Sequence, residues 1–263
     1  MIEYAQKKLS PLLKLEQVSL WAKLKAPSPK NMMGYPILQN ISWEIFPGDR
    51  IIIAGKSGSG KTSLLRLLNR LEDPSSGKIY LNNQEYPKIP MVELRRQVVL
   101  VAQEPKMLGM TVRESLAYPL LLRNISQGET EERIGYWRER LKIPQPWMGM
   151  TELELSLGQQ QLVTLVRALV TLPKILLLDQ PLSALDPVET SWLLERITEG
   201  ISDLCPDVKI AVLMVTYQID TFQEFSNRLL YLEQGQIVTN LASSQVEWDA
   251  LKTGLIKPAE EEW

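Results

Sequence analysis

The feature that most constrains this chain is a glycine-rich loop between an apolar strand and an amphipathic helix. Three isoleucines at 51–53 precede the loop as a buried strand, and leucines within 64–68 give the following segment an apolar helical face. In that order, glycines let consecutive backbone N–H groups surround a phosphate, and the helix N-terminus attracts its negative charge. The sequence therefore predicts a nucleoside triphosphate site built from Gly55, Lys56, Ser57, Gly58, Ser59, Gly60, Lys61, Thr62 and Ser63.

Two side chains of the loop and one later carboxylate complete the predicted phosphate chemistry. Lys61 is placed to reach the β- and γ-phosphates, and the hydroxyl of Thr62 is a Mg²⁺ ligand in such loops. A second buried strand at 175–178 ends in Asp179, the residue type that holds Mg²⁺ through water beside a phosphate loop. A Gly/Ser-rich turn and an ordinary strand end are the alternative interpretations. The presence of both features in one chain favours the nucleotide site.

Composition excludes several kinds of chemistry. The 263 residues contain no histidine, so imidazole cannot act as a base, and zinc sites of the Cys/His type are excluded. The single cysteine, Cys205, excludes an internal disulfide and agrees with a reducing compartment. The net charge is −2 and no block of lysine and arginine stands out, which predicts no nucleic-acid partner.

The apolar segments are too short to cross a membrane. The longest runs, 175–178 and 210–215, have the length of strands, and none approaches the roughly 18 apolar residues of a spanning helix. Residues 1–10 do not resemble a signal peptide. We therefore expect a cytoplasmic protein that reaches the cytoplasmic face of a membrane only through a partner.

The pattern of elements predicts an α/β fold in a single domain. Alternating apolar runs and turn signals indicate a small N-terminal antiparallel sheet, and buried strands alternating with helices indicate a mostly parallel sheet. We expect a core of about 11–103 and 161–241, an inserted helical subdomain at about 104–160, and a solvated tail at 242–263. Residues 26–31 are typical of a solvent loop. The expected later elements are strands at 78–81, 97–101, 175–178, 210–215 and 229–232 and helices at 162–170, 188–201 and 221–227.

Further motifs surround this framework in a fixed order. Gln103 follows an apolar strand, the pentapeptide Leu155-Ser156-Leu157-Gly158-Gln159 opens a helix, and Pro181 to Asp186 follow Asp179. Together with the phosphate loop, these segments resemble the nucleotide-binding subunits of ATP-binding cassette (ABC) transporters over about residues 13–240. The resemblance implies a P-loop NTPase core, and it matches the segments to the Walker A loop, Q-loop, signature, Walker B strand and D-loop of that family.

The resemblance also implies the cofactors. ATP and Mg²⁺ are expected, with the metal held by Thr62, Gln103 and Asp179. Gln103 would in addition sense the γ-phosphate and link the nucleotide to a transmembrane permease subunit on a separate chain. An aromatic ring should stack on adenine. Trp21 is the first candidate and Tyr35 the second, and each is equally compatible with a packing role.

The signature implies a dimer. Ser156 and Gly158, with Gln159 beside them, would cap the γ-phosphate bound by the opposite subunit of a head-to-tail dimer, and Asp186 would cross that interface. A signature at a helix start suits this role because its N–H groups favour an anion. The sequence leaves open whether the dimer is a homodimer or a heterodimer with another cassette.

Three positions depart from the family pattern. Gln180 stands where the family has the glutamate that polarises the attacking water, Tyr217 stands at the usual histidine switch, and Leu157 replaces a signature glycine. With Gln103, Gln180 and Tyr217 are the expected catalytic positions. Loss of a general base typically costs about 10²–10⁴ in rate. Glutamine orients water in other phosphate-loop enzymes, so we expect ATP binding with slow hydrolysis.

Three functions fit these residues. The first is the ATP-binding subunit of a transporter, similar to small bacterial iron-export-type cassettes, with residues 107–124 docking on the membrane subunit. The second is a catalytically impaired regulatory module that dimerises on ATP without useful turnover. The third is a soluble cassette ATPase acting on DNA or ribosomes, which the acidic balance and the lack of a coiled coil disfavour. The transported substrate and its direction are not readable from the sequence.

Overall fold

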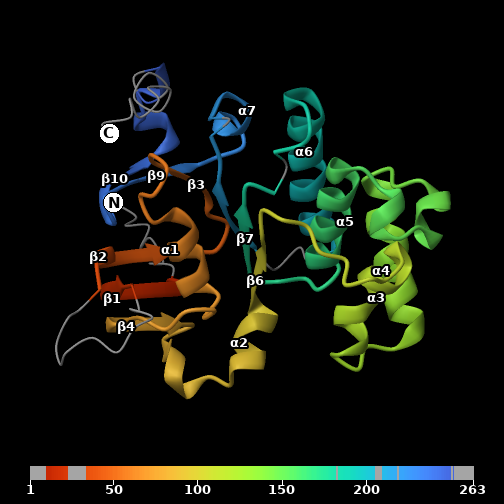
Figure 1. The fold of residues 1–263 in the computed structure, drawn as a ribbon, viewed down its shortest axis with the longest axis horizontal. Helices are drawn as coiled ribbons and strands as arrows, with labels where there is room; N and C mark the ends of the chain where they lie inside the picture. Colours follow the sequence, from red (N-terminus) through yellow and green to blue (C-terminus); the bar gives the residue numbers. More distant parts are fainter. Residues whose placement is uncertain are drawn as a thin grey trace, which may run out of the picture.

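The computed structural model describes residues 10–22, 34–181, 183–204, 209–217, 219–249 and 251. Two sheets with helices around them make up this part of the chain, and a helical part projects from one side (Figure 1). The smaller sheet is antiparallel and has the order β2-β1-β4-β5. Its strands are β1 (Leu13–Trp21), β2 (Pro36–Ile45), β4 (Ser76–Leu81) and β5 (Gln84–Glu85).

The larger sheet has the order β10-β9-β3-β8-β7-β6. All its neighbouring strands are parallel except β10 and β9, which form an antiparallel hairpin. The predicted α/β fold with a mostly parallel sheet and a small antiparallel sheet is thereby confirmed. The strands are β3 (Arg50–Ala54), β6 (Val98–Val101), β7 (Ile175–Asp179), β8 (Ala211–Val215), β9 (Arg228–Glu233) and β10 (Gln236–Ala242).

The central strand β3 is buried on both faces, which explains its unbroken run of isoleucines. Ile51 and Ile53 pack into one core with the leucines of α1 (Lys61–Leu68) and the antiparallel sheet. Ile52, which points the other way, packs into a second core formed with the helices on the opposite face. Since a fully buried side chain of this size contributes about 1.5–3 kcal/mol, the two cores hold the strand firmly beneath the phosphate loop.

The helical part contains α3 (Val112–Leu121), α4 (Gln127–Arg140) and the first turns of α5 (Leu157–Leu169). Each helix begins after a hydroxyl side chain that accepts a hydrogen bond from a backbone N–H of the first turn, at Thr111, Ser126 and Ser156. Because α5 runs without a break through residue 160, the helical part and the core share this helix. The remaining helices are α2 (Met91–Gln97), α6 (Pro187–Leu204) and α7 (Ile219–Gln223), with short 3₁₀ turns η1 (Tyr86–Lys88), η2 (Gln145–Gly149), η3 (Glu152–Glu154) and η4 (Ser243–Gln245).

One predicted helix is shorter than expected. The sequence pattern suggests a helix over 221–227, but α7 ends at Gln223. The side chain of Asn227 instead donates to the carbonyl of Gly48 over 3.0 Å and accepts from the N–H of Arg50 over 2.8 Å. These bonds fix the chain at the start of β3, so Asn227 serves the strand edge and not a helix.

Two expectations fall outside the part of the chain that the structure describes. They concern the loop at 26–31 and the final residues of the tail. Strand β10 and helix α2 were not anticipated from the sequence. Within the described ranges, no helix combines the length and apolar character needed to cross a bilayer.

Candidate nucleotide-binding site

The phosphate loop joins β3 to α1, and its glycines are required by two different constraints. Gly60, the residue before α1, has φ 101°, and a Cβ there would lie 2.8 Å from Leu38 Cδ2 and 2.9 Å from the Ile37 carbonyl. Gly58 has φ 74° but faces open space, and a Cβ added there would meet nothing within 4 Å. Only glycine adopts both conformations without strain, and at Gly58 it also leaves room for a ligand.

Lys61 occupies the centre of this loop. Its side chain donates to the carbonyls of Gly55 and Lys56, each over 2.7 Å, and to Ser59 Oγ over 3.3 Å. Because the residue is only 5% exposed, burial lowers the pKa of the Lys61 ammonium to about 8, an effect that nearby Asp179 opposes. The loop therefore holds a cation at low solvation, which a phosphate can stabilise.

Asp179 ends β7 within reach of the same loop. Burial raises the pKa of this carboxyl, while the Thr62 hydroxyl and the Lys61 ammonium act in the opposite direction. Its Oδ1 is buried and has no hydrogen-bond partner. A buried oxygen without a partner is costly unless a ligand satisfies it. Asp179 and the hydroxyl of Thr62 form the oxygen-rich donor set that Mg²⁺ prefers, so the residues present fit a magnesium ion with a triphosphate.

A cavity of about 690 Å³ opens at the loop and brings together a part of the predicted site. Lys61, Thr62, Gln103, Gln180 and Tyr217 all line it, although they come from four different segments of the chain. The carboxyl ends of parallel strands meet at one edge of a sheet, which brings these residues together. The remaining lining residues are Tyr35, Pro36, Ile37, Gln39, Ser57, Gly58, Gly60, Ser63, Gln234 and Gly235.

Gln103 and Gln180 contact each other across the cavity. Gln103 Nε2 donates to Gln180 Oε1 over 3.5 Å. Gln180 has φ 49°, and its N–H donates to the carbonyl of Val215 over 3.0 Å, which fixes its backbone between β7 and β8. Since the oxygen of Gln180 faces Gln103, its amide N–H₂ group is left as a donor, with no group able to accept a proton from water.

Tyr217 follows β8, the strand that lies between β3 and β7. Its ring centroid lies 5.0 Å from Lys61 Nζ, within the range of a cation–π contact. The residue is 48% exposed and lines the cavity. A tyrosine at this position supplies a neutral donor and a π face, whereas it supplies no positive charge at neutral pH.

The two candidates for adenine stacking lie in different surroundings. Tyr35 lines the cavity and is 71% exposed. Trp21 ends β1 opposite Pro36, is partly buried, and does not line the cavity. The stacking role stays a prediction, and the geometry favours Tyr35 over Trp21.

The signature residues lie apart from this cavity, at the start of α5. Ser156 Oγ accepts from the N–H of Gln159, and Gln159 Oε1 accepts from the N–H of Ser156 in return. Asp186 precedes α6 and accepts through Oδ1 from the N–H of Glu189 over 2.8 Å. Their expected action on the ATP of an opposite subunit therefore stays a prediction.

Sequence reasoning missed three glutamines. Gln39 and Gln234 line the cavity, and Gln39 Nε2 donates to the Gln234 carbonyl over 3.0 Å. Gln161 is 3% exposed and bonds to the segment after Asp179. Only Gln161 gave a usable signal, because a glutamine on the apolar face of a helix needs a specific partner.

A second groove of about 830 Å³ adjoins the cavity and shares Thr62 and Gln103 with it. It runs between β6 and α3, and its cationic side chains outnumber its acidic ones. The pKa of Arg123 is lowered by burial and by the neighbouring Arg96 and Arg133, and burial lowers the pKa of Arg167. The cationic residues of the groove are Arg66, Arg95, Lys106, Arg123 and Arg167, and the acidic ones are Glu104 and Asp179.

Comparison with known proteins shows the family of the chain. The family model described as ABC transporter matches residues 38–183, and the chain belongs to that family. The general L-amino acid transport ATP-binding protein AapP of Rhizobium johnstonii is 34% identical over 78% of this chain and 79% of its own length. The methionine import ATP-binding protein MetN of Caulobacter vibrioides is 32% identical over 81% of this chain and 64% of its own length. ABC ATP-binding proteins are ATPases.

Solved structures of ABC cassettes share the fold. The dimeric post-hydrolysis state of the cassette MJ0796, bound to ADP and Pi, has a TM-score of 0.76 and 25% sequence identity. The alignment covers 88% of this chain and 98% of that one. The predicted family is thereby confirmed, whereas the resemblance to iron-export cassettes stays a prediction.

Proposed function

We propose that this chain is the ATP-binding subunit of a transporter. It binds Mg-ATP at a dimer interface and couples binding and slow hydrolysis to transport by a separate membrane subunit. The observation that carries the proposal is the joint placement of Lys61, Thr62, Gln103 and Gln180 in one cavity beside the buried oxygen of Asp179. The ATP-binding relatives in amino acid and methionine transport support the same role.

Each part of the cavity has a task in triphosphate binding. The backbone N–H groups of the loop and the first turn of α1 surround the β-phosphate, and Lys61 neutralises the β- and γ-phosphates. Thr62, Gln103 and Asp179 would hold Mg²⁺, which supplies charge neutralisation between the phosphates when bound. Tyr35 stacks on the base. All these groups are intact, so we expect tight binding of the nucleotide.

Hydrolysis rests on fewer and altered groups. Gln180 can orient a water molecule through its amide, but it cannot take the proton of that water. Tyr217 can donate a hydrogen bond to the γ-phosphate but cannot add positive charge. Because phosphoryl transfer depends mainly on positioning and electrostatics, slow turnover remains compatible with these residues.

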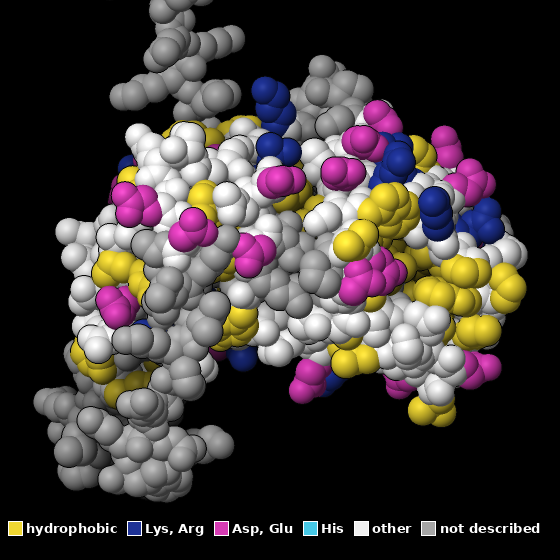
Figure 2. Space-filling view, turned by 90° about the horizontal axis from the view of Figure 1, so that it is seen from above, with side chains coloured by type: hydrophobic (Ala, Val, Ile, Leu, Met, Phe, Trp, Pro, Cys, Tyr) yellow, Lys and Arg dark blue, Asp and Glu magenta, His cyan; other side chains and the backbone are white. Residues whose placement is uncertain are grey.

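The groove beside α3 supports a membrane partner at the cytoplasmic face. Large hydrophobic side chains that line it stay exposed, namely Leu108, Tyr118 and Leu122, and the neighbouring Leu121 is exposed as well. Hydrophobic side chains also gather on the right-hand end of the molecule, which carries the helical part (Figure 2). A surface that combines exposed apolar side chains with basic residues suits a short docking segment of the permease.

The signature supports a head-to-tail dimer. Ser156, Gly158 and Gln159 present a helix N-terminus that would cap a γ-phosphate bound by the opposite subunit, and Asp186 lies close to the same surface. In a homodimer both sites would carry Gln180, whereas a partner cassette could supply one site with an intact base.

Gln180 also supports the alternative function, a catalytically impaired regulatory module that dimerises on ATP. A regulatory module would bind ATP, dimerise, and release the nucleotide without useful turnover. The amide at position 180 favours this alternative, since a clamp that depends only on binding does not need a general base.

The test compares Mg-ATP turnover and ATP-dependent dimerisation for the wild type, Gln180→Glu and Lys61→Ala. We expect the wild type to dimerise and turn over slowly, Gln180→Glu to be about 10²–10⁴ faster, and Lys61→Ala to do neither. Wild-type turnover equal to that of Gln180→Glu would show that the amide is not limiting. Wild-type dimerisation with no measurable turnover would establish the regulatory module.

A further inference from the structure

The signature helix is bonded directly to the segment 183–186. Gln161 Nε2 donates to Ser183 Oγ over 3.2 Å, and Gln161 Oε1 accepts from the N–H of Ala184 over 3.2 Å. Gln161 is only 3% exposed, so losing either bond would leave a buried polar group without a partner. Gly158, one helical turn earlier, packs against the same segment, because a Cβ there would lie 2.8 Å from Leu185 Cδ2 and 3.5 Å from the Ala184 carbonyl.

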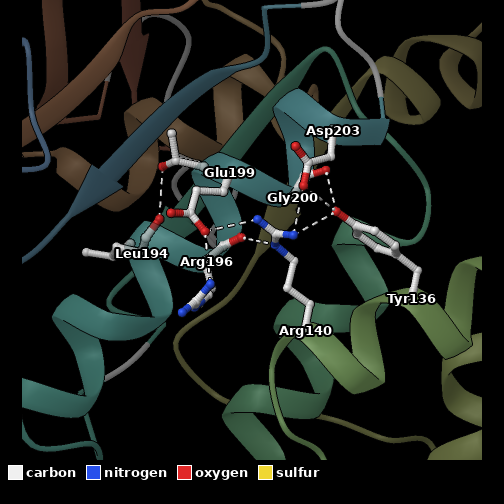
Figure 3. A network of polar contacts seen from close by, with 8 residues as sticks. Tyr136, Arg140, Leu194, Arg196, Glu199, Gly200 and Asp203 are labelled. Atoms are coloured by element: carbon white, nitrogen blue, oxygen red, sulfur yellow. Dashed lines mark hydrogen bonds and ion pairs between the residues drawn. The ribbon is translucent and has the colours of Figure 1, made fainter.

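A second connection joins the helical part to the helix that follows this segment. Arg140 on α4 donates through Nη1 to Asp203 over 2.8 Å, through Nη2 to Glu199 over 3.0 Å, and through Nε to the Arg196 carbonyl over 2.8 Å. Figure 3 shows the guanidinium of Arg140 between these acceptors, with the hydroxyl of Tyr136 beside it. One exposed ion pair contributes little, but this side chain is only 18% exposed and, with the Tyr136 hydroxyl as a further acceptor, engages four groups at once.

The side chains around Arg140 are closely packed between α4 and α6. The Tyr136 hydroxyl oxygen lies 3.3 Å from the Gly200 carbonyl oxygen and 3.2 Å from Asp203 Oδ2, and its single O–H can donate to either acceptor. A Cβ at Gly200 would lie 2.7 Å from Arg140 Cδ and 2.8 Å from Trp137 Cη2. The close approach of α4 and α6 therefore requires glycine at this point of α6.

Both connections end on one continuous segment. Residues 183–186 lead directly into α6, and α6 carries three of the four acceptors of Arg140. On the other side, α4 and the start of α5 both belong to the helical part. The helical part that carries the signature therefore contacts the segment 183–204 at two places. Gln161 makes the contact close to the signature, and Arg140 on α4 makes the one farther away.

We infer that Gln161 and Arg140 are positioning residues that present the signature and the segment 183–186 to an opposite subunit as one rigid surface. The inference rests on the proposed function, because it concerns the dimer proposed there. A partner must meet both elements at once, so any freedom between them has to be lost when the dimer forms. Because hydrogen bonds already hold the signature and the segment 183–186 together in the monomer, dimer formation does not have to meet that entropic cost.

The test uses the full chain with Gln161→Met, which removes both bonds at similar volume, and Arg140→Met, which keeps the apolar stem. Arg138→Met is the matched control, because Arg138 lies on the same helix and contacts Glu139 and Gln145 but not α6. ATP affinity is measured by titration at protein concentrations too low for dimerisation. The dimer dissociation constant is then measured in saturating Mg-ATP by sedimentation velocity.

We expect both test variants to weaken the dimer by roughly tenfold while monomer ATP affinity changes less than twofold, and Arg138→Met to change neither. Ser183→Ala, an exposed position that removes only one partner of Gln161, should give a smaller loss and is available if Gln161→Met fails to fold. Dimerisation of the test variants equal to that of the wild type would overturn the inference alone. A wild type that binds ATP without dimerising would overturn both the inference and the proposed dimer.

Discussion

The low pKa of Lys61 predicts that ATP binding takes up a proton. In the free protein, burial lowers the pKa of this ammonium to about 8, so a part of the molecules carries a neutral lysine near physiological pH. The β- and γ-phosphates would place negative charge against Lys61 and restore the ammonium. The folded, nucleotide-free protein therefore has the lower pKa, and binding must draw protons from solution as pH rises through that value.

The number of protons taken up per ATP follows from the pKa of Lys61 alone. With a free pKa of about 8 and a lysine that is fully charged when ATP is bound, uptake is about 0.1 proton per ATP at pH 7, about 0.5 at pH 8 and about 0.9 at pH 9. ATP affinity should fall over the same range in proportion to the charged fraction of Lys61. Between pH 7 and pH 9 this amounts to about tenfold, or about 1.4 kcal/mol.

Isothermal titration calorimetry measures the uptake directly. Binding is recorded at each pH in two buffers of different ionisation enthalpy, and the slope of observed heat against that enthalpy gives the number of protons. The pH 7 measurement on the same protein is the internal control. Tyr217→Ala should move the uptake curve to lower pH, because it removes the π face beside the ammonium. Uptake near zero at both pH 8 and pH 9, with ATP still bound, would refute the argument that burial controls this lysine.

Two further predictions concern the base and the helical part. Tyr35→Ala should weaken ATP binding by about 1–3 kcal/mol in a competition assay against a fluorescent nucleotide, while Trp21→Ala should have little effect. The reverse order would restore Trp21 as the stacking residue. Gly200→Ala should lower the unfolding free energy by about 1–3 kcal/mol in urea titrations, because its Cβ overlaps the side chains of α4. Gly128→Ala, where the added Cβ meets nothing within 4 Å, should be neutral or stabilising, and an equal loss in both would argue against overpacking.

The phosphate loop could be predicted from the sequence because its physics is local. The strand at 51–53, the glycines and the leucine face of α1 are contiguous, and each residue has its function within about one turn of its neighbours. Gln103 and Gln180 are different, since 77 residues separate them and only the parallel sheet order brings their amides together. Their proximity followed from the family resemblance and not from spacing.

Features that depend on sheet register could not be predicted in the same way. Trp21 and Tyr35 are both aromatic residues near the ends of neighbouring strands, and only the pairing of Trp21 with Pro36 decides which ring faces the cavity. The end of α7 has the same origin, because Asn227 bonds to residues 177 and 179 positions earlier in the chain. Secondary-structure propensities of neighbouring residues cannot predict hydrogen-bond partners that lie so far away in the sequence.

Two of the three departures from the family pattern, Gln180 and Tyr217, fall on a physically distinct part of the site. In the proposed site, ATP binding would use the contiguous loop and Asp179, whereas water activation would need Gln180 and Tyr217, which follow β7 and β8, to converge on one point. A sequence can therefore lose the second function while the first remains intact. Gln103 Nε2 already donates toward position 180, and a glutamate carboxylate could accept that bond in place of the Gln180 amide oxygen. Gln180→Glu would then add a proton acceptor without removing a contact, which is why its effect should appear in turnover and not in nucleotide affinity.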